Sequence, residues 1–125
     1  MYRHQPLLGP ESIRAAEATE CAAKQGRFWE YHDLVFANQE GKNAGAFGDA
    51  NLKGFAVSLR LNLDTFSACL ESDQYAEIVE RSNKDANDLG VRSIPTTFIN
   101  GRRLEGLGGY DVYRRMIEEE LAAAQ

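Results

Sequence analysis

Between residues 12 and 89, apolar side chains recur every three or four positions, which is the spacing of amphipathic helices. The pattern predicts helices over residues 13–25, 27–38, 51–61 and 65–71, and then a long helix that ends at Leu89. Local signals mark several of the ends, since Pro10 opens the first helix, Asp64 is a good N-cap for the fourth and Gly90 follows the last. Most of the chain is therefore predicted to be a set of packed helices.

The pattern changes after Gly90, in the stretch V-R-S-I-P-T-T-F-I-N-G-R-R-L over residues 91–104. Pro95 disfavours helix at the residue before it and opens the run Thr96–Ile99, which is β-branched and aromatic as strands prefer. Asn100-Gly101 is the strongest short signal for a hairpin turn, because both residues must take positive φ. We expect a second strand after this turn and then a last helix capped by Asp111, with these side chains facing inward: Val112, Met116, Ile117 and Leu121.

The composition limits the classes of partner. The chain has 125 residues, enough for one domain with a real core, and 43% of them are hydrophobic. Its net charge of -5, without a basic stripe, argues against nucleic acid as a main partner. The apolar runs are far too short to span a bilayer and no signal peptide opens the chain, so we expect no membrane partner either.

Aromatic residues gather in the predicted second helix. We interpret its large apolar side chains first as core and, as the alternative, as a platform for stacking a ligand: Phe28, Trp29, Tyr31, Leu34, Val35 and Phe36. His4 and His32 are the only histidines, and no spacing around them is typical of a metal site. We therefore expect neither a metal nor a cofactor.

Two stretches of this sequence carry a resemblance to a known family. Residues 91–104 are similar to the segment V-x-G-T-P-T-F-F-V-N-G, and residues 22–39 match A-A-x-x-G-x-F-W-E-Y-H-D-L-x-F-x-N-Q. Both motifs are found, in this order, in the DsbA-like thiol-disulfide oxidoreductases, a branch of the thioredoxin superfamily. The chain resembles this family over essentially its whole length.

The resemblance implies a role for the proline loop. In the family the matching proline is cis and faces a redox-active Cys-x-x-Cys, and the backbone beside it pairs with a substrate peptide as an added strand. By this match, Ile94, Pro95 and Thr96 are the expected substrate-binding residues, although many members have threonine at the place of Ile94. The alternative for Pro95 is an ordinary proline at the first position of an edge strand.

The Cys-x-x-Cys itself is not in this sequence. M-Y-R-H-Q-P-L at residues 1–7 resembles the family segment V-Y-R-H-F-P-L, which ends a strand that comes after the cysteine motif. The resemblance therefore implies an N-terminally truncated domain. We expect no catalytic residue here, and no thiol exchange by this chain alone.

Cys21 and Cys69 are the only cysteines, and they are too far apart in the chain to form such a motif. Three interpretations remain open: a structural disulfide, two buried free thiols, or a redox pair between helices. Some relatives in the family carry a cysteine pair at matching places, which favours the structural disulfide. A bridge closing a loop of this size would stabilise the fold by about 3–4 kcal/mol.

Together these features predict an α/β fold, a thioredoxin-like domain over residues 1–125 that is N-terminally truncated. Its helical insertion is expected over 12–89, and its proline loop, hairpin and last helix over 91–123. The implied function is protein disulfide exchange, in a family that is usually periplasmic or otherwise extracytoplasmic. The alternative is a non-catalytic module that binds peptides or assembles through a bare sheet edge.

The missing front strand has a physical consequence for the predicted hairpin. Without that strand, one edge of the hairpin has no neighbour, and an unpaired edge invites another chain. We therefore expect an extended polypeptide, or the strand of a second copy in a homodimer, to pair with this edge.

Overall fold

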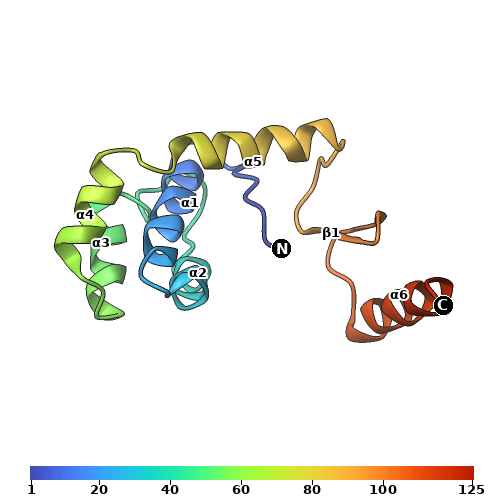
Figure 1. Ribbon diagram of the computed structural model, residues 1–125. Helices are drawn as coiled ribbons and strands as arrows, with labels where there is room; N and C mark the ends of the chain where they lie inside the picture. Colours follow the sequence, from blue (N-terminus) through green and yellow to red (C-terminus); the bar gives the residue numbers. More distant parts are fainter. The chain divides into compact units, whose positions relative to one another are not determined.

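The computed structural model describes residues 1–125 and contains six helices and two strands (Figure 1). In chain order these are α1 (Pro10–Ala23), α2 (Phe28–Ala37), α3 (Asp49–Ser58), α4 (Leu63–Glu71), α5 (Ala76–Asp88), β1 (Thr96–Ile99), β2 (Arg102–Glu105) and α6 (Tyr110–Ala123). They form two compact units, Met1–Asp85 and Ala86–Gln125. None of the helices combines the length and the apolar character needed to cross a membrane.

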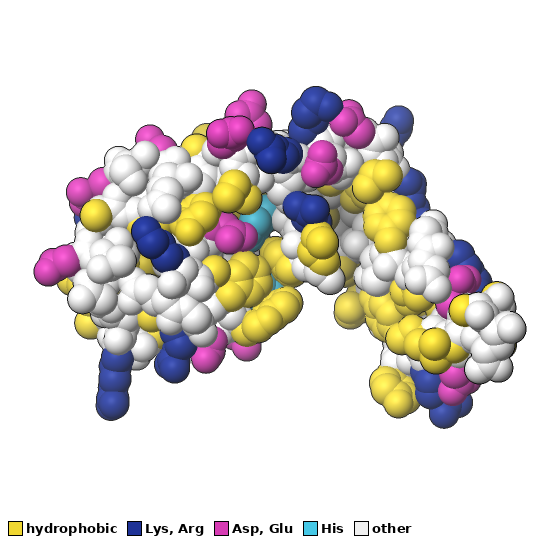
Figure 2. Space-filling model, in the orientation of Figure 1, with side chains coloured by type: hydrophobic (Ala, Val, Ile, Leu, Met, Phe, Trp, Pro, Cys, Tyr) yellow, Lys and Arg dark blue, Asp and Glu magenta, His cyan; other side chains and the backbone are white.

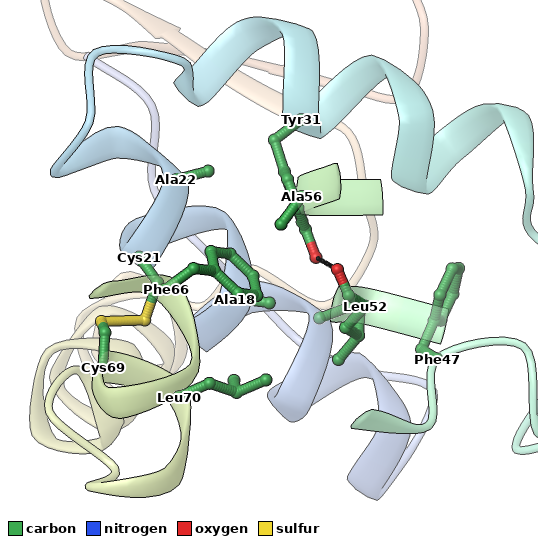
Figure 3. Close-up of a cluster of buried hydrophobic side chains, with 11 residues drawn as sticks. Ala18, Cys21, Ala22, Tyr31, Phe47, Leu52, Ala56, Phe66, Cys69 and Leu70 are labelled. Carbon is green, nitrogen blue, oxygen red and sulfur yellow. Dashed lines mark hydrogen bonds between the residues drawn. A yellow bond between two sulfur atoms is a disulfide. The ribbon is translucent and has the colours of Figure 1, made fainter. Parts of the chain in front are cut away.

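The core of the first unit lies where α1, α2, α3 and α4 meet (Figure 3). α1 is rich in alanine, and because Ala18 and Ala22 are small and fully buried, the other helices pack closely against it. Leu52 of α3 and Phe66 of α4 fill the space between the helices. Tyr31 of α2 is also fully buried, and its hydroxyl donates a hydrogen bond of 2.8 Å to the carbonyl of Leu52. That bond satisfies the one polar atom this side chain brings into the core.

A second set of contacts ties the first unit together at its surface. The Arg14 guanidinium of α1 donates to Asp49 at 2.7 Å, to Glu17 at 3.0 Å and to Asp73 at 2.9 Å. These partners stand on α3, on α1 itself and in the turn between α4 and α5. The hydrogen bond from Arg14 is the largest cause that lowers the pKa of the Asp49 carboxyl below its ordinary value.

This network gives a first testable prediction. In an Arg14→Gln variant the pKa of Asp49 is expected to rise toward its ordinary value, because the charge and the hydrogen bonds of the guanidinium are gone. Carbon-detected NMR titration of the Asp49 carboxyl measures this directly. Since the folded pKa is the lowered one, the stability that the pair contributes is fully present above the ordinary aspartate value of about 3.9. It is lost as the pH falls through the lowered value.

Arg81→Gln is the matched control for this prediction, because Arg81 pairs with Glu77 on the exposed side of α5 and does not contribute to the lowered pKa of Asp49. The Asp49 titration should be the same in this control as in the unchanged protein. If the pKa of Asp49 did not change in Arg14→Gln, Arg14 would not be the cause of the lowered value.

All of the predicted helices form, with shifted ends. The predicted N-cap of α4 was Asp64, but the helix begins at Leu63, and Asn62 is the cap. The side-chain oxygen of Asn62 accepts a hydrogen bond of 2.8 Å from the Thr65 amide. α6 likewise begins before the predicted cap Asp111, and Gly109 precedes it without a side-chain cap. In both places the helix starts earlier than the capping signal, so the predicted aspartate lies in its first turn.

The second unit is a hairpin with a helix packed on it, drawn in orange and red in Figure 1. Its turn is Asn100-Gly101 as predicted, with φ of 48° and 85°, and only glycine takes the second of these values without strain. β1 pairs antiparallel with β2 alone, so that Thr97 faces Leu104 and Phe98 faces Arg103. α6 packs on β1, where the Tyr113 and Thr97 hydroxyls lie 3.4 Å apart.

Several side chains predicted to face inward are exposed instead. In α2 only Tyr31 is buried, whereas Trp29 and Phe36 are more than half exposed. In α6 only Met116 is buried, and Ile117 and Leu121 are exposed. The reason for α6 is that two strands are too narrow to cover more than one stripe of the helix.

The strand expected near Tyr2 is not formed, because residues 1–9 have no neighbouring strand to pair with. This segment is held by side chains instead. His4 is buried, with its Nε2 atom 2.7 Å from a Glu20 oxygen, and its carbonyl accepts a hydrogen bond of 2.9 Å from Ser82.

Candidate functional site

The three residues predicted to bind substrate follow one another at the start of the hairpin. The Ile94–Pro95 peptide bond is cis, and the Ile94 side chain is 52% exposed. Two hydrogen bonds shape the loop around them. The Gly106 amide donates to the Pro95 carbonyl at 2.8 Å, and the Thr96 hydroxyl donates to the Ser93 carbonyl at 2.7 Å. Ile94 and Pro95 are therefore presented to solvent on a loop closed from both sides.

The edge of β1 next to this loop has no partner strand. In an antiparallel pair, residues alternate between those whose backbone groups face the partner strand and those whose groups face away. The two-residue turn and the hydrogen bond from the Gly106 amide to the Pro95 carbonyl show which residues of β1 bond to β2. By this alternation Thr97 and Ile99 bond to β2, and the amide and carbonyl groups of Thr96 and Phe98 point outward. The edge thus offers a row of free donors and acceptors beside the exposed Ile94.

Arg103 holds the loop in place. Its guanidinium donates hydrogen bonds to the carbonyls of Leu89 and Gly90, which directly follow α5, and lies 3.3 Å from Glu105. It also lies over the Phe98 ring, 5.3 Å from the ring centre. Arg103 therefore connects the chain entering the loop to the chain leaving the hairpin, on the face opposite α6.

Cys21 and Cys69 lie in the core of the first unit (Figure 3). They form a disulfide between α1 and α4 with an S–S length of 2.06 Å, and there is no free cysteine in the chain. Their side chains are 2% and 3% exposed. A bridge so deeply buried is shielded from attack by a second thiol, and its structural role stays a prediction.

Aromatic and imidazole rings cluster on the surface of the first unit, where hydrophobic side chains and a histidine lie together in Figure 2. Tyr2 meets Phe28, Trp29 and both histidines edge-on, with ring centres 5.2 to 5.8 Å apart. Burial, and then the charge of Glu20, raises the pKa of the Tyr2 phenol. No group of three or more potential metal ligands gathers here or elsewhere in the chain.

Comparison of the sequence with known protein families shows which family has this architecture. A family model described as thioredoxin matches residues 1–119. The chain belongs to the thioredoxin family. Its helices and small two-stranded sheet are thus the α/β fold of a thioredoxin-like domain.

The curated relatives of this thioredoxin-like chain are much longer proteins. It is 41% identical over 109 residues to Na(+)/H(+) antiporter NhaA 1 of Salinispora arenicola, which covers 85% of the chain and 16% of the relative. It is 37% identical over 128 residues to Na(+)/H(+) antiporter NhaA 3 of Salinispora tropica, covering 100% and 19%. It is 40% identical over 106 residues to Na(+)/H(+) antiporter NhaA of Herminiimonas arsenicoxydans, covering 85% and 16%. The chain spans less than a fifth of the length of each of these proteins.

Sequence reasoning found the loop of this thioredoxin-like domain but missed Arg103. A signal for it was available, because counting outward from a two-residue Asn-Gly turn places residue 103 directly across from Phe98. An arginine facing an aromatic residue on one face of a hairpin indicates a stacked pair. The bonds from Arg103 to the end of α5 had no such signal, since they depend on how the loop folds back.

Proposed function

We propose that this chain is the peptide-binding part of a DsbA-like thiol-disulfide exchange domain and does not itself carry out exchange. The observation that supports binding most directly is the unpaired β1 edge beside the exposed Ile94 and Pro95. An extended polypeptide adds to such an edge as a further strand, with backbone hydrogen bonds supplying affinity. The site would then select for extended conformation more than for a particular sequence.

The chemistry of exchange needs a thiolate, and in this chain both sulfurs are joined and buried. In an insulin-reduction assay with dithiothreitol, the chain is therefore expected to leave the rate at that of the reductant alone. Turnover above this rate that is abolished by alkylating Cys21 and Cys69 would contradict the proposal, because it would make those two cysteines the redox pair.

Peptide binding is tested with a fluorescein-labelled, alkylated insulin B chain as the extended probe, followed by fluorescence anisotropy. Ile94→Glu is expected to weaken binding by roughly tenfold or more, since it puts a charge where an apolar contact forms on docking. Ile78→Glu is the matched control, because Ile78 on α5 is 47% exposed against 52% for Ile94. Equal loss in both variants, or no measurable binding by the unchanged protein, would overturn the proposed site.

A second candidate function comes from the names of the relatives. We propose that a domain like this one serves a sodium/proton antiporter as an accessory binding domain, since the chain matches a segment of proteins named NhaA antiporters. In the Salinispora arenicola relative, deleting the matching segment is expected to leave the protein in the membrane and to change sodium tolerance of antiporter-deficient cells. Unchanged tolerance would count against a role in transport.

A further inference from the structure

The turn between β1 and β2 carries a polar side chain that no other group of the chain holds. Asn100 is exposed, and its side-chain amide makes no hydrogen bond within the chain. The backbone amide of Gly101, the next residue, also donates no hydrogen bond. A carbon added to Gly101 at the place of a Cβ would meet no atom within 4 Å. The side-chain carbonyl of Asn100 and the nitrogen of Gly101 are therefore free of neighbours that would keep them apart.

The other asparagines of the chain are held in place. Side-chain hydrogen bonds fix four of them: Asn38, Asn43, Asn51 and Asn62. Asn83 and Asn87 lie within α5, where the helical hydrogen bonds engage the amide of the following residue. Asn100 is also the only asparagine that precedes a glycine. Structure and sequence thus single out the same residue.

An asparagine followed by glycine can react with its own main chain, because the two reacting groups are already joined and no side chain shields the glycine nitrogen. The Gly101 nitrogen gives its proton to hydroxide and bonds to Cγ of Asn100. The bond from Cγ to the side-chain nitrogen then breaks, and that nitrogen takes a proton from water and leaves as ammonia. The product is a succinimide ring.

Water opens the succinimide at either of its two carbonyl carbons. Addition at Cγ gives aspartate at position 100. Addition at the backbone carbonyl carbon gives isoaspartate, in which the main chain runs through the former side chain. Water is the only co-reactant consumed, and nothing is oxidised or reduced.

The turn slows this reaction without preventing it. Ring closure requires the backbone of Asn100 to rotate out of the turn conformation, in which its φ is 48°. Exposed turns open locally at a small cost in free energy, and no hydrogen bond of the Asn100 side chain has to break first. The folded chain is therefore expected to react, at a lower rate than the unfolded chain.

We propose that Asn100 is a site of spontaneous deamidation in the folded protein, and that its isoaspartate product loosens the β1–β2 hairpin. Isoaspartate adds one carbon atom to the main chain between Ile99 and Gly101. The pairing of Ile99 with Arg102 leaves a turn of two ordinary residues, so the longer chain no longer fits it. This inference is independent of peptide binding, because it rests on the turn alone.

Peptide mapping by mass spectrometry tests the reaction on the full chain. After storage at mildly alkaline pH and digestion with trypsin, peptide 93–102 is expected to gain the mass difference between a hydroxyl and an amino group. It should separate into an aspartate and an isoaspartate form, at a rate proportional to the hydroxide concentration. Peptide 43–53 is the matched control within the same sample. Its Asn43 also has a positive φ, of 49°, but the Asn43 side chain accepts a hydrogen bond from the Glu11 amide and an alanine follows it.

Two further samples make the mapping decisive. A portion digested without storage gives the conversion that digestion itself causes, and a portion stored in urea gives the rate of the unfolded chain. If peptide 93–102 converted in urea but not in the folded protein, the turn would protect Asn100 and the proposal would be wrong. Equal conversion of peptides 43–53 and 93–102 in the folded protein would overturn it as well.

Hydrogen exchange tests the effect on the hairpin. In the isoaspartate form, separated by ion-exchange chromatography, the amides of β1 and β2 are expected to exchange faster than in the unchanged protein. Asn100→Asp is the matched control, because aspartate brings the same charge without the extra carbon atom, and Asp-Gly also suits this turn. Equal exchange in the isoaspartate form and in Asn100→Asp would show that the longer main chain does not loosen the hairpin.

Discussion

Replacing Cys21 and Cys69 together by alanine is expected to lower the free energy of unfolding of the first unit by about 4 kcal/mol. The cysteines are 48 positions apart, and in the chain-entropy model a bridge across a loop of that length removes this much freedom from the unfolded chain. Loss of two buried sulfurs from the contact between α1 and α4 acts in the same direction. Since a domain is stable by only about 5–15 kcal/mol, the variant should be close to unfolding.

Urea unfolding followed by the fluorescence of Trp29, the only tryptophan, measures this change in the first unit. The unchanged protein with its bridge reduced is the matched control, because it keeps both sulfur atoms and loses only the covalent link. The reduced protein should therefore be more stable than the alanine variant, by the part of the free energy that the packing of the two sulfur atoms contributes. A loss below about 1 kcal/mol in the alanine variant would contradict a structural role for the bridge.

The second unit shows which parts of the fold could be predicted from the sequence. Asn100-Gly101 permits hardly any other turn, and the β-branched run before it has few alternatives to a strand. These are local signals, in which a few adjacent residues determine their own backbone. The loop around Pro95 was found for a related reason, since a proline between a helix end and a strand leaves little choice of conformation.

The first unit shows where local signals fail. α2 has large apolar side chains typical of a core at Phe28, Trp29 and Phe36, yet its buried residue is Tyr31. Burial depends on which face of the helix the neighbouring helices cover. Residues far apart in the chain decide this. The same holds for Arg14, because its partner Asp49 is on α3 and its partner Asp73 is in the turn between α4 and α5, and no spacing in the sequence connects them.

The division of labour between the two units bears on function. The first unit holds the disulfide in a closed core, where both cysteine side chains are shielded from solvent. The second unit has a small sheet with an open edge, exposed apolar groups and a proline loop held by Arg103. The proposed binding site thus lies in the smaller unit, in which fewer side chains are buried.

Phe66→Ala should lower the free energy of unfolding of the first unit by about 3–5 kcal/mol, and Phe36→Ala by less than about 1 kcal/mol. Phe66 is completely buried, with its ring centre 5.5 Å from that of Tyr31, so its removal leaves a cavity among four helices. Phe36 is 59% exposed, and its ring centre lies 4.6 Å from that of His32. The two variants delete the same atoms, so the difference between their urea midpoints isolates the effect of burial. Equal losses would mean that the aromatic cluster around Trp29 is core after all, and that a further contact covers α2 in solution.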